Sequence, residues 1–126
     1  MIFGWKYGLI WVNLDIKYDG KWYHIDNCIL DTGSATTAID IDLVDFNYQK
    51  PAEIKRLRGI GSGTQEVVSQ QLDSLIIGQS KLHDIEIEFG DIQEDLGING
   101  FIGTDILSRF TLTIDFAQKT ITLKPQ

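Results

Sequence analysis

The sequence predicts an all-β fold, a closed barrel or sandwich of short strands with one short helix near its C-terminal end. Apolar and polar residues alternate over several stretches, which is the two-residue period of a half-buried strand. Tight turns separate these stretches, for example at Asp19-Gly20 and at Gly78-Gln79-Ser80. The 126 residues are expected to form one domain, residues 1–126, because no repeat, linker or low-complexity segment divides them.

The N-terminal part is predicted to open with a β-hairpin. Apolar residues at every second position from Ile10 to Tyr18 alternate with Asn13, Asp15 and Lys17, and residues 21–30 form the return strand after the turn. The return strand becomes more fully apolar toward Asp31, so we expect its far end to be buried on both faces. A short strand is expected at 36–39, and residues 41–46 are expected to form a helical turn or a loop.

The remaining elements follow the same pattern. Residues 54–60 and 64–77 are predicted to be extended, and residues 85–89 are predicted to form a strand with an acidic outer face. We expect Thr104 to cap a short helix with Asp105 in its first turn. A hairpin is predicted from Leu112 to Leu123, with its turn at residues 117–119.

Charge, hydropathy and cysteine content argue against several kinds of partner, location and chemistry. The net charge of −7 disfavours nucleic acid and anionic membranes as partners. No stretch reaches the length of about 20 apolar residues that spans a bilayer, and Met1–Lys6 lacks the features of a signal peptide, so a cytoplasmic location is expected. Cys28 stands alone in an apolar run, which favours a core thiol over a nucleophile.

The local sequence argues against three other kinds of site: a nucleotide-binding loop, a metal site and a serine triad. The cluster Gly59–Gly63 lacks the further glycine of a dinucleotide fingerprint, where Thr64 stands, and the Lys of a Walker loop. His24 and His83 have no ligand spacing with one another, so no metal and no cofactor are expected. A serine nucleophile at Ser34 would lack the usual elbow motif, and one at Ser62 would sit on a hairpin tip.

The segment Ile29-Leu30-Asp31-Thr32-Gly33-Ser34-Ala35 carries the strongest chemical signal. By itself it is good turn chemistry, because Asp and Ser bond nearby amides and Gly tolerates positive φ. A carboxylate at this position can also serve hydrolysis, in which a base deprotonates water and an acid protonates the leaving group. Two carboxylates that share one proton fill both roles. Since the motif occurs once, a symmetric homodimer would supply the second Asp31.

At this point the chain resembles the retropepsin-like aspartic proteases, single-lobe relatives of pepsin that act as dimers. The resemblance covers most of the chain and rests on three features in order: the segment from Ile29 to Ala35, the glycine-rich segment Gly59–Gly63, and Phe101-Ile102-Gly103 with the short helix after it. It implies a single-lobe, retropepsin-like closed β-barrel with one short C-terminal helix. It also implies a homodimeric aspartic endopeptidase that acts on peptide or protein substrates without a cofactor.

The resemblance implies a role for each matching residue. Asp31 would activate the lytic water, and Thr32 would bond across the dimer axis to the partner's loop. The Gly33 amide would donate to a carboxylate oxygen, and Ser34 would do likewise with its hydroxyl or amide, with Ala35 completing the motif. The flap residues Ile60, Gly61, Ser62 and Gly63 would close over an extended peptide, while Phe101, Ile102 and Gly103 would pack beneath the loop. Asp105 is a candidate in-chain partner for Asp31, but its position in the first turn of the helix favours a helix-cap role.

Two points remain open at the level of sequence. In viral proteases the chain ends interleave to form the dimer interface, whereas here the C-terminal strands are expected to form a complete hairpin within the chain. The same groove and flap could also hold an extended peptide without cleaving it. The alternative function is therefore a catalytically weak or inactive retropepsin-like module for peptide binding or dimerisation.

Overall fold

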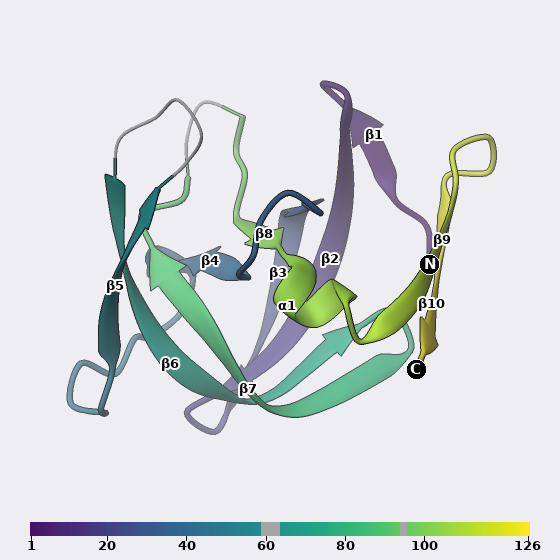
Figure 1. Cartoon of the computed structure of the whole chain (residues 1–126). Helices are drawn as coiled ribbons and strands as arrows, with labels where there is room; N and C mark the ends of the chain where they lie inside the picture. The colour runs from purple at the N-terminus through teal and green to yellow at the C-terminus, as the bar shows by residue number, and fades with distance from the viewer. Residues whose placement is uncertain (59–63, 94–95) are drawn as a thin grey trace.

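The computed structural model describes residues 1–58, 64–93 and 96–126, which form mainly β-strands, as predicted (Figure 1). Helical structure in these residues is limited to the 3-10 turn η1 (Ile41–Leu43) and the short helix α1 (Thr104–Leu107). The strands are β1 (Gly4–Lys6), β2 (Leu9–Tyr18), β3 (Lys21–Leu30), β4 (Ala38–Asp40), β5 (Glu53–Arg58), β6 (Thr64–Ile77), β7 (Ser80–Gly90), β8 (Gly100–Ile102), β9 (Phe110–Asp115) and β10 (Thr120–Pro125). Among the described residues no helix has the length and apolar character needed to cross a bilayer.

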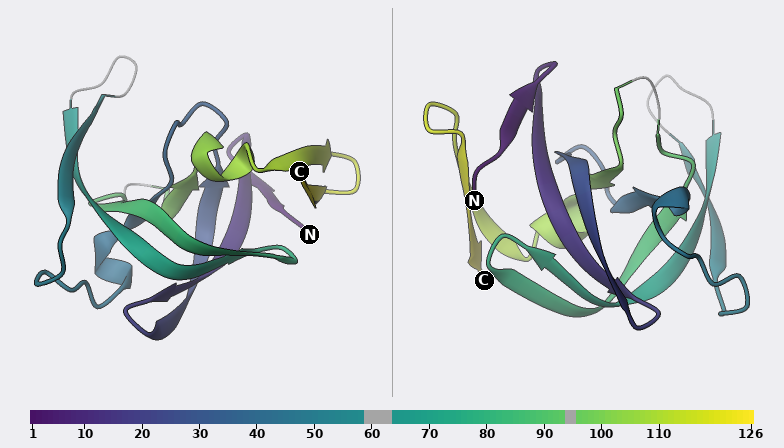
Figure 2. Two further views of the ribbon diagram at one scale, coloured as in Figure 1. Left: turned by 60° about the horizontal axis from the view of Figure 1, so that its bottom comes forward. Right: turned by 180° about the vertical axis from the view of Figure 1, so that it is seen from behind.

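Eight strands form one curved sheet in the order β1-β2-β3-β8-β4-β7-β6-β5. An additional pairing of β2 with β6, through Asp15, Ile16 and Lys17, brings the sheet back onto itself. This agrees with the closed architecture that the sequence predicts. The remaining strands, β9 and β10, form a separate hairpin beside α1 (Figures 1 and 2).

The hairpin of β2 and β3 carries the chain to its chemically distinctive segment. Its turn, Asp19-Gly20, has positive φ at both residues, as a tight two-residue turn requires. The register shifts between Val12 and Leu14, and Asn27 on the opposite strand also has positive φ. Such a bulge increases the local twist. Beyond it, the last residues of β3 run parallel to β8, with Leu30 opposite Ile102.

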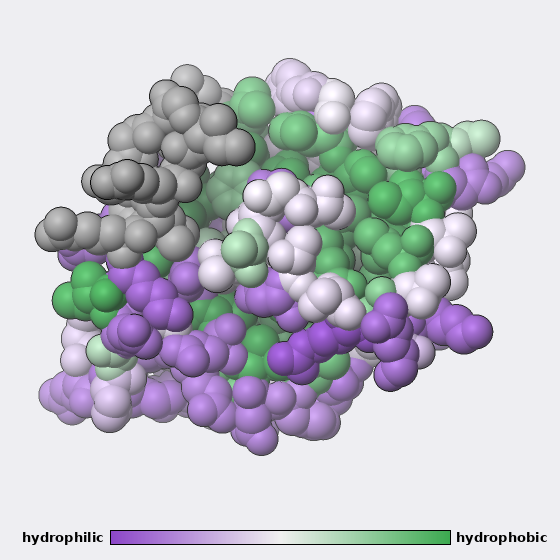
Figure 3. Space-filling view, in the orientation of Figure 1, coloured by the Kyte–Doolittle hydropathy of each residue, from purple (hydrophilic) through white to green (hydrophobic). Residues whose placement is uncertain are grey.

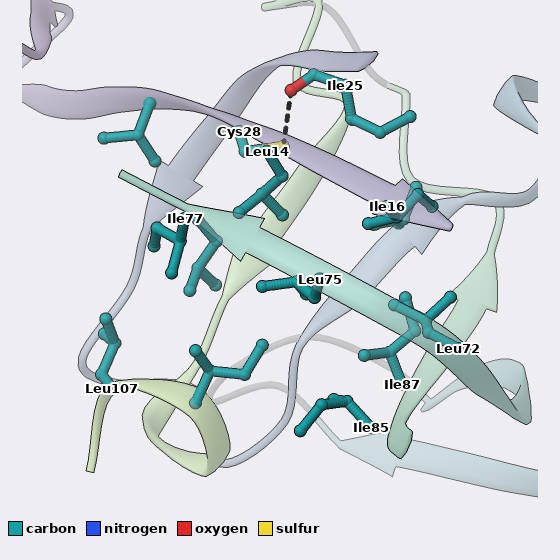
Figure 4. Packing of buried hydrophobic residues seen from close by; sticks show 14 of the residues in the cluster. Leu14, Ile16, Ile25, Cys28, Leu72, Leu75, Ile77, Ile85, Ile87 and Leu107 are labelled. Atoms are coloured by element: carbon teal, nitrogen blue, oxygen red, sulfur yellow. Dashed lines mark hydrogen bonds between the residues drawn. The ribbon is translucent and has the colours of Figure 1, made fainter. Parts of the chain in front are cut away.

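The core lies inside the curved sheet and is filled by aliphatic side chains from β2, β6 and β7 together with α1 (Figure 4). Cys28 is fully buried there, as predicted, and its thiol donates to the carbonyl oxygen of Ile25 at 3.9 Å (Figure 4). Burial, with a smaller contribution from the charge of Asp26, raises the pKa of this thiol to about 12. The thiol is therefore a neutral packing group at physiological pH.

The two chain ends lie together against the C-terminal hairpin (Figure 2). The amide of Phe3 donates to Lys119 O at 3.0 Å, and the amide of Ile121 donates to Met1 O at 2.8 Å. Strand β10 pairs with β9 from Thr120 to Pro125. The C-terminal strands thus form a hairpin within the chain, as predicted.

One strand was not predicted, and two local expectations need correction. Strand β1 was not predicted, because its three residues are all exposed and show no alternation. The acidic outer face of β7 ends before Glu88, which is only 3% exposed because β4 runs parallel beside it. Thr104 is not the cap of α1: the N-cap is Gly103, and the Thr104 hydroxyl donates to Ser34 O at 3.3 Å.

Candidate functional site

Asp31 lies immediately after β3, where the chain leaves the sheet. Its amide donates to Ile102 O at 2.9 Å, which continues the parallel pairing of β3 with β8 by one residue. Its side chain is half-buried, and Oδ1 accepts a hydrogen bond from the amide of Gly33 at 2.9 Å. The amide of Ser34 donates to the Asp31 carbonyl at 3.2 Å, which closes a turn. The predicted reversal of the backbone and the predicted Gly33 bond are both present.

The loop that follows, residues 31–37, lies beside β8 and α1 (Figure 1). Ser34 O accepts from the amide of Thr104 at 2.8 Å. Gly103 passes so close to the loop that an added Cβ would lie 2.5 Å from Thr36 O and 2.7 Å from Ser34 O. Only glycine permits this approach, because a side chain would overlap the backbone. The predicted support of the loop by Gly103 therefore has a steric basis.

The far end of the loop is held by side chains. Thr37 donates from its amide to Asp105 Oδ2 at 3.0 Å and from its hydroxyl to Asp105 Oδ1 at 2.7 Å. The same hydroxyl accepts from the amide of Gly103 at 3.0 Å. Thr36 donates from its hydroxyl to Glu88 Oε2 at 2.8 Å, and the amide of Glu88 donates to Thr37 O at 3.0 Å. Helix α1 and strand β7 thus both hold this end of the loop.

A cavity of about 200 Å³ adjoins this network. Its lining residues include Glu86, Glu88 and Asp105 together with Lys55. The Glu86 carboxylate accepts from the Ser69 hydroxyl at 2.5 Å. In the described part of the chain, no three His, Cys, Asp or Glu side chains converge as a metal site requires.

The structure places the other predicted site residues as follows. Thr32 and Ala35 are exposed, and Phe101 is half-buried beside the buried Ile102. The predicted bond from Ser34 to the carboxylate is wrong: the Ser34 hydroxyl donates to Thr36 O at 2.7 Å, and its amide donates to the main chain of Asp31. The tight turn brings the Ser34 side chain back onto its own loop. The flap residues Ile60, Gly61, Ser62 and Gly63 lie outside the described residues.

Sequence reasoning missed the residues that anchor the far end of the loop. Thr37 and Asp105 are separated by 68 positions, and Thr36 and Glu88 by 52. No local pattern connects such partners. The one available signal was the repeated hydroxyl pair Thr36-Thr37 directly after the Asp31 motif, since hydroxyl side chains at loop ends commonly bond to carboxylates or backbone.

The arrangement combines a half-buried carboxylate with a loop fixed by backbone and side-chain hydrogen bonds, which is what a general acid or base requires. A family model described as retroviral aspartyl protease matches residues 5–115. The chain belongs to this family. Retroviral aspartyl proteases are hydrolases of the aspartyl protease type, and the matched region includes the Asp31 loop, β8 and α1.

Comparison with solved structures agrees on the fold. A crystal structure of a retropepsin-like aspartic protease from Rickettsia conorii superposes with a TM-score of 0.68 at 19% sequence identity. The similarity covers 98% of this chain and 89% of the Rickettsia chain. At this identity the likeness establishes the retropepsin-like fold alone. No curated protein matches the sequence.

Proposed function

We propose that this member of the retroviral aspartyl protease family is a homodimeric endopeptidase whose catalytic dyad is Asp31 of each copy. The observation that carries the proposal is the placement of Asp31. Its half-buried carboxylate lies at the start of a loop that is hydrogen-bonded to β8 and α1. The chain that carries it belongs to this protease family. A single chain offers one such carboxylate, so the site is complete only with a second copy.

The chemistry follows from two carboxylates that share one proton. Like charges about 3 Å apart cannot both ionise, so one group is a base and the other an acid. The base takes a proton from water as the water oxygen bonds to the peptide carbonyl carbon, while the acid gives its proton to the carbonyl oxygen. Collapse of the tetrahedral intermediate then breaks the carbon–nitrogen bond. The amine leaves with the proton that the base took from water, and one hydroxyl of the intermediate returns a proton to the other carboxylate, so that the dyad again shares one proton.

Other residues of this chain are proposed to support this mechanism. The amide of Gly33 donates to Asp31 Oδ1 and orients the carboxylate. Thr32 and Ala35 are exposed on the isolated chain, and we assign Thr32 to a bond with the partner's loop. Phe101, Ile102 and Gly103 support the loop. Ile60, Gly61, Ser62 and Gly63 are proposed to cover an extended peptide substrate.

Exposed apolar side chains near the chain ends support a second copy as partner. Trp5 of β1 and Phe116 of the β9–β10 turn are 48% and 56% exposed. Their rings pack edge to face, with the ring centroids 5.5 Å apart. Figure 3 shows apolar residues gathered on the side of the molecule where β1 and the C-terminal hairpin lie. Because β10 already pairs with β9 of its own chain, we propose that dimers form without exchange of chain ends.

The test combines oligomeric state with cleavage. Sedimentation should show a dimer at micromolar concentration, and peptide libraries should be cleaved between about pH 4 and 7, where a proton-sharing dyad is competent. Asp31→Asn should abolish cleavage, whereas Asp45→Asn, at an exposed carboxylate paired with Lys21 at the turn end of the β2–β3 hairpin, should not. Full activity of Asp31→Asn would contradict the proposal. A chain that binds peptides without cleaving them would instead support the binding-module alternative.

A further inference from the structure

We propose that Asp105 is a positioning residue of the Asp31 site, which fixes the loop of residues 31–37 by binding Thr37 with both carboxylate oxygens. This inference rests on the proposed function, since it names the group that keeps the catalytic carboxylate in place. Asp105 does not contact Asp31 in this scheme. It acts through Thr37 and through the start of α1.

The contacts of Asp105 exceed what a helix cap needs. Its Oδ1 accepts from the amide of Ile106 at 2.8 Å, which is a local bond within the first turn of α1. The same carboxylate also accepts the Thr37 amide at 3.0 Å and the Thr37 hydroxyl at 2.7 Å. These two bonds cross from helix to loop and do nothing for the helix itself. A bidentate carboxylate fixes the position and the orientation of the residue that it holds.

Thr37 connects Asp105 to the segment of β8 and α1 that also holds Asp31. Its hydroxyl accepts from the buried amide of Gly103, and the next amide, that of Thr104, donates to Ser34 O. One residue before Gly103, Ile102 O accepts from the amide of Asp31. Both ends of the loop and its centre are therefore tied to the single short segment from Ile102 to Asp105.

An amide side chain cannot replace the carboxylate at position 105. If asparagine turns its oxygen toward the Thr37 hydroxyl and the Ile106 amide, its NH₂ group faces the Thr37 amide, and two donors oppose each other. If it turns the other way, its NH₂ group faces the Ile106 amide. Each orientation leaves a donor without an acceptor. The near-isosteric change Asp105→Asn thus tests charge and acceptor geometry without changing side-chain volume.

The partner residue gives an independent pair of variants. Thr37→Ser keeps the hydroxyl that donates to Asp105 and accepts from Gly103, so it should preserve the link. Thr37→Val keeps the shape but removes the hydroxyl, which leaves the Gly103 amide without its acceptor. If Asp105→Asn does not fold, Thr37→Val and Thr37→Ser test the same link from the loop side.

Tyr18→Phe is a matched control for general loss of stability. Tyr18 is fully buried, and its hydroxyl donates to Gln70 and accepts from the amide of Asn47 at 3.0 Å. It lies at the turn end of the β2–β3 hairpin, opposite Lys21, whereas Leu30 and Asp31 lie at the other end. The control therefore removes a buried, hydrogen-bonded hydroxyl at a distance from the site.

The kinetic experiment compares kcat and KM of the full-length dimer and its variants on one cleaved peptide. Asp105→Asn and Thr37→Val should lower kcat by about tenfold to a hundredfold with little change in KM, because displacement of a catalytic group affects the chemical step. Thr37→Ser should stay close to the wild type, and so should Tyr18→Phe despite a lower unfolding midpoint. A loss of kcat in Asp105→Asn and Thr37→Val no greater than in Tyr18→Phe would overturn the inference.

Amide hydrogen exchange separates this inference from the proposed function. The amides of Thr104 and Asp31 are not altered by the substitutions but belong to the same network. They should exchange about tenfold faster in Asp105→Asn and Thr37→Val, and not in Tyr18→Phe, as local opening predicts. A wild type that cleaves no peptide would defeat the proposed function. Exchange would then decide the positioning role, and unchanged rates would overturn it.

Discussion

Two aspartates each follow two apolar residues at the end of a strand: Asp31 comes after Ile29-Leu30 of β3, and Asp40 comes after Ala38-Ile39 in β4. Asp40 is 1% exposed, and its carboxylate accepts three backbone hydrogen bonds. Its Oδ1 accepts from the amide of Asp42 at 2.9 Å. Its Oδ2 accepts from the amides of Ile92 and Gln93 at 3.0 and 2.7 Å. Asp40 thus holds the start of η1 and the chain beyond β7 together.

Asp31 is arranged differently. Its carboxylate is half-buried, and within the described ranges the bond from the Gly33 amide is the one hydrogen bond that it receives. The loop around Asp31 is fixed by other groups, above all by Thr37 and Asp105. The two carboxylates therefore differ in their surroundings: that of Asp40 is surrounded by donors, whereas that of Asp31, which we propose to be catalytic, is held through its backbone while its oxygens stay accessible.

The largest expected effect separates the two aspartates by activity. Asp31→Asn should lower kcat by at least about a thousandfold, because it removes the group that we propose to activate water. It should leave the unfolding midpoint nearly unchanged, since only the Gly33 bond involves the replaced group. Steady-state cleavage and thermal unfolding of the same preparation measure both quantities. A variant that unfolds as readily as Asp40→Asn would contradict the distinction.

Asp40→Asn should show the opposite pattern. The asparagine oxygen can replace only one carboxylate oxygen, so at least one of the amides of Asp42, Ile92 and Gln93 then faces an NH₂ group. We expect the free energy of unfolding to fall by about 2–4 kcal/mol, as for loss of charge-assisted bonds in a buried site. Urea unfolding measures it. Per folded molecule, kcat should stay within about threefold of the wild type.

This pair also shows how far the sequence could lead. Asp31 could be singled out because Thr32-Gly33-Ser34 follow it directly, and the strands around it could be predicted from their alternation. The importance of Asp40 could not be recognised, because two of its three donors lie 52 and 53 positions away. The burial of Glu88 was hidden for the same reason, since β4 and Thr36 approach it from a distant part of the chain.

The glycines close to the two aspartates differ in the atoms that surround them. A Cβ at Gly103 would lie 2.5 Å from Thr36 O, in the backbone of the Asp31 loop. A Cβ at Gly90, which pairs with Asp40, would lie 2.9 Å from the Val67 side chain. Gly103→Ala must therefore displace backbone and should cost about 1–3 kcal/mol of unfolding free energy together with a loss of kcat.

Gly90→Ala is the matched variant for this prediction. The Val67 methyl group belongs to a side chain and can move by a small amount, so this alanine should cost less stability and leave kcat unchanged. Urea unfolding and steady-state kinetics compare the two variants. Equal effects on kcat would mean that the Asp31 loop is no more sensitive to its neighbours than the Asp40 region.

The smallest effect at neutral pH concerns the strand that carries Asp31. Burial raises the pKa of the Cys28 thiol from 9.0 to about 12, with a smaller contribution from Asp26. The folded chain therefore keeps its proton in a range where the unfolded chain loses it. The free energy of unfolding should be independent of this group below about pH 9 and should fall above it, by at most about 1.4 kcal/mol per pH unit.

Cys28→Ala isolates this contribution, because lysines and tyrosines that titrate in the same range are present in both chains. The difference in unfolding free energy between wild type and Cys28→Ala should be constant up to about pH 9 and then shift against the wild type as pH rises. Native Cys28 should also react with a thiol reagent far more slowly than the unfolded chain. Rapid labelling at neutral pH would show that β3 opens to water close to Asp31, and the two aspartates would then differ less in their surroundings than their hydrogen bonds indicate.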